Sequence, residues 1–430
     1  MRSPLSPARS AAFHILERVE STSEHSDDLL HGPALKPLSP LDRNLATALV
    51  LGVLRWQIAL DAQLRSLLDR PDQPLPAPIQ IALRLGAFQL LHMDRIPAHA
   101  ALSESVELVR SAGHPKAAGL VNAILRKLTQ APPARKSLVE TLEGAAIRLG
   151  HPAWLVERWA VSYGRVAALA ICEYDQHEPP PADLFSVVGG EQESSGGGMD
   201  LGAPMDSGSR LVAELAAAMV SDPGRVWDAC AAPGGKTSVL ARRHPGAELL
   251  ATDINARRLE AMKRRLDREL GGQPVTAIQA DAARLPPEAG SFDLILCDVP
   301  CSGTGTFAHN PEIRHRLQAS ELQRQAERQR EILSHALTRL RPGGRLLYST
   351  CSLEPEENER VVRSVLESGA KPTGVNLLPV LEVLQQLHAS KILRSDASAL
   401  GSLTSGEFLR TLPGTNFPGD GFFAAIFAQA

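Results

Sequence analysis

The sequence is poor in aromatic residues and carries no large excess of charge. Aromatic residues make up 4% of its 430 positions, with four tryptophans and three tyrosines, so few side chains are available to stack on unpaired bases. The formal net charge is -3, which excludes a chain that is basic throughout and binds nucleic acid by charge alone. Local clusters of lysine and arginine can still bind phosphates.

The cysteine content and the hydropathy exclude further classes of protein. The cysteines form no C-x-x-C pair and no histidine-rich segment accompanies them, so we expect no metal site and a reduced, cytoplasmic protein. No apolar run is long enough to span a bilayer, and residues 1–20 lack the apolar centre of a signal peptide. We therefore expect no membrane association. The five cysteines are Cys172, Cys230, Cys297, Cys301 and Cys351.

Residues 1–135 have the pattern of a helical domain. The whole chain is longer than one hydrophobic core usually organises, so we expect two or three domains. In this first part apolar residues recur at three-to-four spacing, as in helices that bury one face. The stretches that show this spacing are 11–19, 41–68, 79–92, 98–109 and 117–128. Proline and glycine separate them, which predicts a compact all-α bundle of about five or six helices.

Residues 136–206 are predicted to be a helical connector followed by a flexible linker. The prolines at 132 and 133 break the helical pattern, which returns in 154–174. Residues 189–198 consist of glycine, serine, glutamate and glutamine. Such a composition cannot bury a core, so this stretch is predicted to be flexible.

From residue 207 to 430 the pattern changes to alternating strands and helices. The candidate strands are 225–230, 248–253, 275–281, 292–298, 345–350 and 422–428. The helical stretches between them are 237–243, 256–270, 320–340 and 357–366. This alternation predicts an α/β, Rossmann-like domain built on a parallel, doubly wound sheet with helices on both faces.

A glycine-rich turn follows the first candidate strand. Residues 228–237 read DACAAPGGKT, and glycines and small residues there let the backbone approach a ligand at the next helix's N-terminus. A Walker A loop would end in the same Gly-Lys-Thr, but it needs a glycine where Cys230 stands. Asp253 and Asp281 end the next two strands, where an acidic side chain can bind the ribose of an adenosine-type cofactor. For either aspartate alone, a helix N-cap role is an equal alternative.

Two cysteines and an aspartate follow the fourth and fifth strands. Asp298 and Cys301 lie in DVPCSGTG, and Cys351 lies in STCS. Because the carboxyl ends of parallel strands meet at one edge, we expect all three near the ligand. Cys172 and Cys297 have no such place and are predicted to be inert buried residues. A thiolate, a carboxyl group and a proton acceptor are what methylation of C5 of cytosine requires, through addition to C6 and stabilisation at N3.

Three motifs together resemble the RNA cytosine-C5 methyltransferases. They are residues 228–237 (DACAAPGGKT), 298–305 (DVPCSGTG) and 349–358 (STCSLEPEEN). Residues 412–423 (LPGTNFPGDGFF) are also similar to that family. In the first part, residues 43–60, 96–109 and 119–128 resemble the NusB-like RNA-binding domain that precedes the methyltransferase in the bacterial 16S rRNA enzymes.

The resemblance implies roles for individual residues. Cys351, in the Thr-Cys-Ser motif, would be the nucleophile, and Cys301 would assist release of the methylated RNA. Asp298 would face both the base and the methyl donor. The residues implied to contact S-adenosyl-L-methionine are Cys230, Ala231, Ala232, Pro233, Gly234, Gly235, Lys236, Asp253, Asp281 and Asp298. The implied partner is RNA, 16S rRNA above all, and we expect a monomer.

The sequence departs from the family between residues 179 and 206, where a small α/β segment that helps to grip RNA is shortened or lost. Two other functions stay open: a tRNA cytosine-C5 methyltransferase, and a noncatalytic RNA-binding or ribosome assembly factor. Arg314 and Arg316, which follow the Cys301 loop, are candidates for contacts with RNA phosphates.

Overall fold

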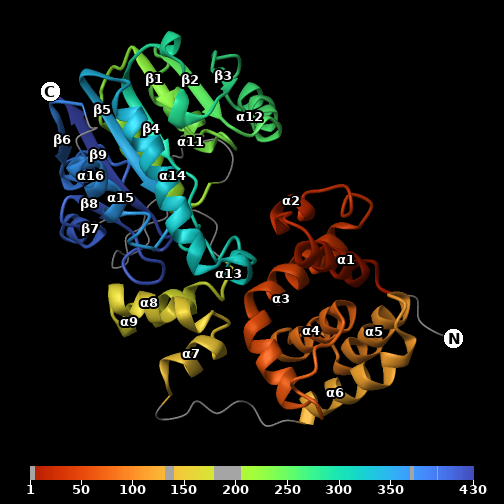
Figure 1. Ribbon diagram of the computed structural model, residues 1–430. Helices are drawn as coiled ribbons and strands as arrows, with labels where there is room; N and C mark the ends of the chain where they lie inside the picture. The colour runs from red at the N-terminus through yellow and green to blue at the C-terminus, as the bar shows by residue number, and fades with distance from the viewer. Residues whose placement is uncertain (1–4, 131–139, 179–204, 369–371, 395) are drawn as a thin grey trace. The chain divides into compact units, whose positions relative to one another are not determined.

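The structure is a computed structural model that describes residues 5–130, 140–178, 205–368, 372–394 and 396–430 (Figure 1). Its contacts divide the chain into two units. The helical unit comprises Met1–Glu178 and Phe307–Arg316, and the sheet unit comprises Pro179–Thr306 and Leu317–Ala430. The structure does not describe residues 179–204. The predicted linker at 189–198 and most of the shortened segment at 179–206 therefore lie outside the described residues. The domain boundaries at 135 and 206 remain predictions.

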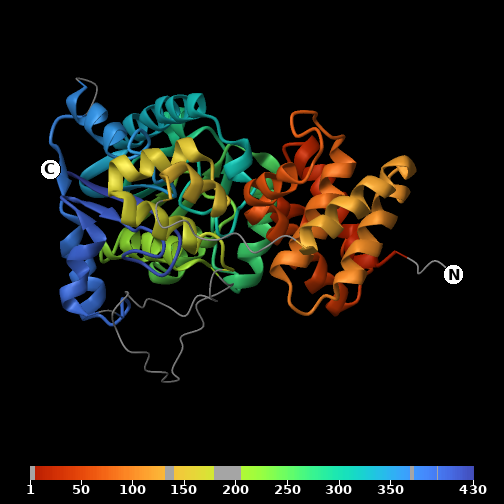
Figure 2. The same cartoon turned by 90° about the horizontal axis from the view of Figure 1, so that it is seen from below.

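The first part of the helical unit is an all-α bundle, as predicted (Figure 2). Its longest helix begins after Ser39, whose hydroxyl accepts a hydrogen bond from the backbone N–H of Asp42 and so caps the first turn. At Gly52 a side chain would collide with the ring of Phe88, 1.9 Å from the ideal Cβ position, so two helices pack closely there. The helices are α1 (Pro7–Ser21), α2 (Ser26–Leu30), α3 (Pro40–Ser66), α4 (Ala77–His92), α5 (Ala98–Ser111) and α6 (Ala118–Gln130).

Helix α3 corrects one expectation from the sequence. By length and composition it could cross a bilayer, since an 18-residue window has a mean hydropathy of 1.4. The sequence did not predict this helix as a possible span because Arg55 interrupts its apolar run. Half of that window is buried, and its apolar residues pack in the core of the helical unit. A core helix of a globular domain accounts for this hydropathy.

The helical unit continues with α7 (Leu142–Arg148), α8 (Ala153–Tyr163) and α9 (Arg165–Tyr174). The helix predicted over 154–174 is therefore two helices. They separate at Gly164, whose φ of 85° is outside the helical range and is accessible to glycine at little cost. Trp159 of α8 is 1% exposed and packs beside Phe307, with ring centroids 5.9 Å apart.

The prediction that Arg314 and Arg316 bind RNA phosphates is wrong for Arg314 and unsupported for Arg316. Both lie in α13 (Ile313–Arg316), within the part of the chain that joins the helical unit. Arg314 is 2% exposed and its guanidinium donates to backbone carbonyls, so it is not free for a phosphate. Arg316 is partly exposed, and its guanidinium also donates to backbone carbonyls. The acceptors are the carbonyls of Arg55, Gly150, Asp175 and Phe307 for Arg314, and of Val19, Ser23, Thr22 and Glu24 for Arg316.

The sheet unit contains a sheet of nine strands among its described residues. Its strand order is β3-β2-β1-β4-β5-β9-β8-β7, and β6 also pairs with β9. The first five strands in this order are parallel, as the alternation of strands and helices predicted. They are β1 (Arg225–Asp228), β2 (Glu248–Asp253), β3 (Thr276–Gln279), β4 (Phe292–Asp298) and β5 (Leu340–Thr350).

Beyond β5 the sheet turns antiparallel. Strand β9 (Phe423–Gln429) runs antiparallel to β5, and β8 and β6 pair antiparallel with β9. The sheet is therefore mixed. The three strands that the sequence did not predict have two to four residues each, too few to show an alternating pattern. They are β6 (Val375–Leu378), β7 (Thr404–Ser405) and β8 (Phe408–Arg410).

Helices cover both faces of the sheet and form two separate cores (Figure 1). Side chains of neighbouring strand residues alternate between these cores. In β4, for example, Leu294 and Leu296 join one core while Ile295 and Cys297 join the other. One face carries α10 (Ser207–Ala218), α11 (Gly235–Arg243), α12 (Ala256–Glu269) and α16 (Val380–Ala389). The other face carries α14 (Ala319–Leu337) and α15 (Glu359–Glu367).

Candidate active site

The glycine-rich turn after β1 lines a pocket of about 220 Å³ at the carboxyl edge of the sheet. Gly234 has a φ of 95°, and a Cβ there would lie 2.5 Å from Cγ of Met262, so the turn requires glycine at this position. Helix α11 begins directly after it. The residues that line the pocket are Met205, Ser209, Asp228, Cys230, Ala231, Ala232, Pro233, Gly235, Lys236, Arg265 and Asp298.

Asp253 and Asp281 do not line this pocket. Asp253 is 7% exposed and accepts hydrogen bonds from the backbone N–H groups of Ala232 (3.2 Å) and Asn255 (2.8 Å). Asp281 caps a short helix through the N–H of Ala283 and forms an ion pair with Arg328. Both carboxylates thus have partners within the protein, and Asp281 is the N-cap of a short helix. Their contact with a donor stays a prediction.

Cys301 and Cys351 lie in contact. Strands β4 and β5 are neighbours in parallel register, with Asp298 opposite Ser349, so the turns that follow them start side by side. The two sulfur atoms are 3.3 Å apart, within hydrogen-bond distance for sulfur. Both cysteines are partly exposed, whereas Cys172 and Cys297 are buried as predicted.

The contact between the two sulfurs distinguishes the thiols. The hydrogen bond with Cys351, together with burial, raises the pKa of the Cys301 thiol well above its usual value. The Cys301 thiol therefore keeps its proton near neutral pH, and either sulfur can be the donor in this contact.

Asp298 is held from two sides at the same edge. Its Oδ2 lies 2.7 Å from Nζ of Lys236, and its Oδ1 accepts a hydrogen bond of 2.8 Å from the hydroxyl of Ser349. Burial lowers the pKa of Lys236, but the ion pair with Asp298 and other nearby groups outweigh this effect, so the pKa is raised. The pair therefore presents a fixed carboxylate in the lining of the pocket.

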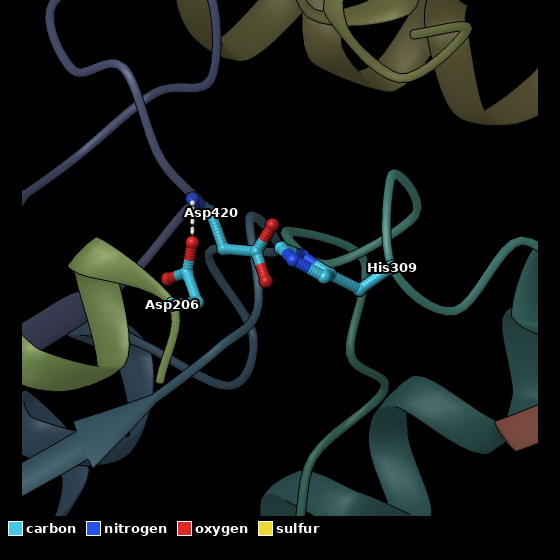
Figure 3. Close-up of side chains that lie close together, drawn as sticks. All are labelled: Asp206, His309 and Asp420. Atoms are coloured by element: carbon cyan, nitrogen blue, oxygen red, sulfur yellow. Dashed lines mark hydrogen bonds between the residues drawn. The ribbon is translucent and has the colours of Figure 1, made fainter. Parts of the chain in front are cut away.

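The last turn of the sheet unit closes against the Cys301 loop. The backbone N–H of Gly305 donates to the carbonyl of Cys351 (2.9 Å), and the N–H of Gly421 donates to the carbonyl of Gly305 (2.7 Å). A Cβ on Gly305 would lie 2.2 Å from the carbonyl oxygen of Gly421, so this approach requires glycine. Figure 3 shows the neighbouring bond from the N–H of Asp420 to Oδ1 of Asp206, 3.1 Å long.

Comparisons with known proteins agree with this geometry. Residues 218–428 match the family model described as 16S rRNA methyltransferase RsmB/F, and residues 6–130 match the NusB family. The ribosomal RNA small subunit methyltransferase B of Xanthomonas campestris is 32% identical over 363 residues, which cover 77% of this chain and 81% of that protein. The chain belongs to the RsmB/F methyltransferase family.

Two further relatives extend the comparison. The probable ribosomal RNA small subunit methyltransferase B of Bacillus subtilis is 30% identical over 84% of this chain and 88% of its own length. The crystal structure of PH0851 has a TM-score of 0.73 and 22% sequence identity, and the alignment covers 99% of both chains. That likeness confirms the Rossmann-like methyltransferase fold and nothing finer.

The pocket fits the methyl donor of RsmB/F methyltransferases, S-adenosyl-L-methionine. Asp228 is 1% exposed and lines the pocket, and its Oδ1 has no hydrogen-bond partner among the described residues. A buried, unpaired acceptor suits a cationic group such as the donor's ammonium. Gly235 faces the same space, where a Cβ would lie 2.5 Å from Cε of Met205. When bound, the donor supplies a methyl group on a positively charged sulfur.

Replacing Asp228 by asparagine should change how the stability of the sheet unit depends on pH. Burial raises the pKa of Asp228 to about 7, against the opposing hydrogen bond from Thr237. The unfolded carboxyl has a model value of 3.8, so the folded state binds more protons between about pH 4 and about pH 7. The contribution of Asp228 to the free energy of unfolding is fully present below about pH 4. It is lost as the pH rises to about 7, by at most about 4 kcal/mol.

The measurement is donor-free unfolding of wild type and Asp228→Asn at several pH values. The stability of wild type relative to the variant should fall as pH rises through the window and stay constant above about pH 7. Asp267→Asn is the matched control, because Asp267 is exposed on α12 and its replacement should give no such trend. A difference between wild type and Asp228→Asn that is constant from about pH 4 to about pH 8 would contradict the raised pKa.

Several residues around the site were missed at the sequence level. Met205, Ser209 and Arg265 line the pocket but precede or follow the motifs that drew attention to it. Glu357 is 0% exposed and lies under both cysteine turns. The sequence offered a hint of Glu357, because it lies in the same motif as Cys351 and a serine follows each of the two cysteines.

Proposed function

We propose that this chain methylates C5 of a cytosine in 16S rRNA through a covalent bond between Cys351 and C6 of the base. The observation that carries the proposal is the 3.3 Å contact between Cys301 and Cys351 beside the anchored carboxylate of Asp298. C5 of cytosine is a weak nucleophile, and addition of a sulfur at C6 turns the ring into an enamine that C5 can use.

Each residue has a distinct task in this proposal. Cys351 adds to C6, and the thiol of Cys301 lies 3.3 Å from the sulfur that adds. Asp298 forms a hydrogen bond at N3 and stabilises the charge that develops in the ring. C5 then takes the methyl group from the sulfonium of the donor, a water molecule acting as base takes the proton from C5, and the sulfur of Cys351 leaves as a thiolate. The thiol of Cys301 assists this release by donating a hydrogen bond to the leaving sulfur next to it.

The donor would be held by the turn after β1. The proposed contacts are the turn residues Cys230, Ala231, Ala232, Pro233, Gly234, Gly235 and Lys236, with Asp253, Asp281 and Asp298. In this division of labour residues 1–135 bind RNA, residues 136–206 connect, and residues 207–430 carry out the chemistry. A cytosine must leave a base stack to reach Cys351, so we propose an unpaired or flipped target.

The test is methylation of unmodified 16S rRNA by the purified chain with labelled S-adenosyl-L-methionine, with tRNA as the second substrate. Nucleoside analysis of the digested RNA should show 5-methylcytidine, from one position of 16S rRNA. Label in tRNA alone would contradict the proposed substrate. Label at another atom would contradict the proposed chemistry. Donor and RNA binding without methyl transfer would point to a noncatalytic assembly factor.

A further inference from the structure

Glu357 joins the two turns that carry the cysteines. It lies in the loop between β5 and α15 and is fully buried. Its Oε1 accepts a hydrogen bond of 2.8 Å from the backbone N–H of Ser302, and its Oε2 accepts one of 2.5 Å from the hydroxyl of Ser352. The hydroxyl of Ser302 also donates to Oε2. Ser302 and Ser352 directly follow Cys301 and Cys351, so one carboxylate contacts both turns.

A helix on one face of the sheet completes this set of hydrogen bonds. Gln329 of α14 donates to Oε1 of Glu357 at 3.0 Å and to the carbonyl of Pro300 at 2.8 Å. Pro300 directly precedes Cys301 in the chain. All four groups around the carboxylate are hydrogen-bond donors, so both oxygens of Glu357 are needed as acceptors. The hydroxyls of Ser302 and Ser352 also lie 3.0 Å apart, which closes the arrangement.

No ion pair compensates this buried carboxylate among the described residues. A buried charge without a cation costs free energy unless hydrogen bonds satisfy it, and a structure that only needed packing would gain from an apolar side chain at this place. The carboxylate contacts neither sulfur directly. Its hydrogen bonds instead hold the backbone N–H and the hydroxyl of Ser302 next to Cys301, and the hydroxyl of Ser352 next to Cys351. In this way a group away from the reacting atoms can set their geometry.

We propose that Glu357 is a positioning residue that sets the separation of the Cys301 and Cys351 sulfurs. The inference rests on the proposed function, in which these two thiols act in succession on one base. A sulfur displaced by about 1 Å costs on the order of a hundredfold in rate. Glu357 therefore acts through the two cysteine turns and not through the donor pocket, whose lining does not include it.

Two kinds of measurement on Glu357→Gln test the proposal. Glutamine keeps the shape of the side chain but turns one acceptor into a donor, so it cannot serve both turns. We expect kcat to fall by about tenfold to a hundredfold, with the KM for RNA and the Kd for S-adenosyl-L-methionine unchanged. Glu356→Gln is the matched control: its carboxylate pairs with Arg360 at 2.9 Å, and kcat should stay at the wild-type value.

The rate at which diamide oxidises the two thiols tests the separation of their sulfurs without relying on methylation. Diamide takes two electrons and two protons from the two thiols, which form a disulfide while diamide is reduced to its hydrazine. The reaction requires the sulfurs to approach bonding distance. We expect it to be fast in the wild type and in Glu356→Gln, and at least about tenfold slower in Glu357→Gln. Slow oxidation in the variant supports the positioning role even if the proposed function fails.

The single variant Ser302→Ala covers the case in which Glu357→Gln does not fold, and wild-type oxidation and kcat in Ser302→Ala would then overturn the proposal. Ser302→Ala removes one donor to the carboxylate and should slow both oxidation and kcat by a smaller factor. If serine acts through Glu357, the same replacement in the Glu357→Gln background should add nothing further. Wild-type oxidation rates in both Glu357→Gln and Ser302→Ala would overturn the proposal, as would a loss of kcat with unchanged oxidation.

Discussion

Cys351→Ala is expected to reduce methyl transfer to 16S rRNA by at least about a thousandfold, because the variant has no group that can add to C6. Binding of S-adenosyl-L-methionine should stay within about twofold of the wild type, since the residues that line the donor pocket do not include Cys351. Single-turnover transfer of a labelled methyl group measures the first quantity, and calorimetric titration with the donor measures the second.

Cys172→Ala is the matched control for this loss. Cys172 is fully buried in α9 of the helical unit, and burial raises the pKa of its thiol, so it is not a nucleophile. Its replacement should leave methyl transfer at the wild-type rate. If Cys351→Ala kept more than about a tenth of the activity, the nucleophile would have to be another group. Loss of donor binding together with activity would point to a misfolded unit instead of a missing sulfur.

Much of the sheet and the edge that carries the site could be predicted from local patterns. The buried apolar runs that end in Asp253 and Asp298 are strands with the predicted bounds. Because ligands bind at the carboxyl edge of parallel strands, the sequence predicted the site after these strands; Asp298 lines the pocket and Asp253 does not. The contact between Cys301 and Cys351 could not be derived in this way, since it depends on β4 and β5 being neighbours.

The features that were missed depend on partners far away in the sequence. The sequence predicted that Arg314 contacts RNA phosphates, which requires an exposed side chain. Arg314 is buried instead, and the carbonyls of Arg55, Gly150 and Asp175 accept hydrogen bonds from its guanidinium. Glu357 had no predicted role, because its hydrogen bond with the Ser302 turn forms only when the fold brings residues 302 and 357 together. Side-chain periodicity carries no information on such long-range hydrogen bonds.

Cys301→Ala is expected to have the opposite effect from Cys351→Ala: the enzyme should methylate once and then stay attached to its RNA. In the proposed mechanism the variant keeps the nucleophile Cys351, so addition at C6 and the first methyl transfer should proceed. It lacks the thiol 3.3 Å from the bound sulfur, and release is slowed. The variant should therefore show one turnover, followed by a protein–RNA adduct that survives denaturation and disappears after digestion with ribonuclease.

Denaturing electrophoresis with labelled 16S rRNA measures this adduct, and the double variant Cys301→Ala/Cys351→Ala provides its control. If the trapped bond is the one from Cys351 to C6, the double variant should form no adduct. An adduct formed by Cys351→Ala, together with loss of the first turnover in Cys301→Ala, would exchange the roles of the two cysteines.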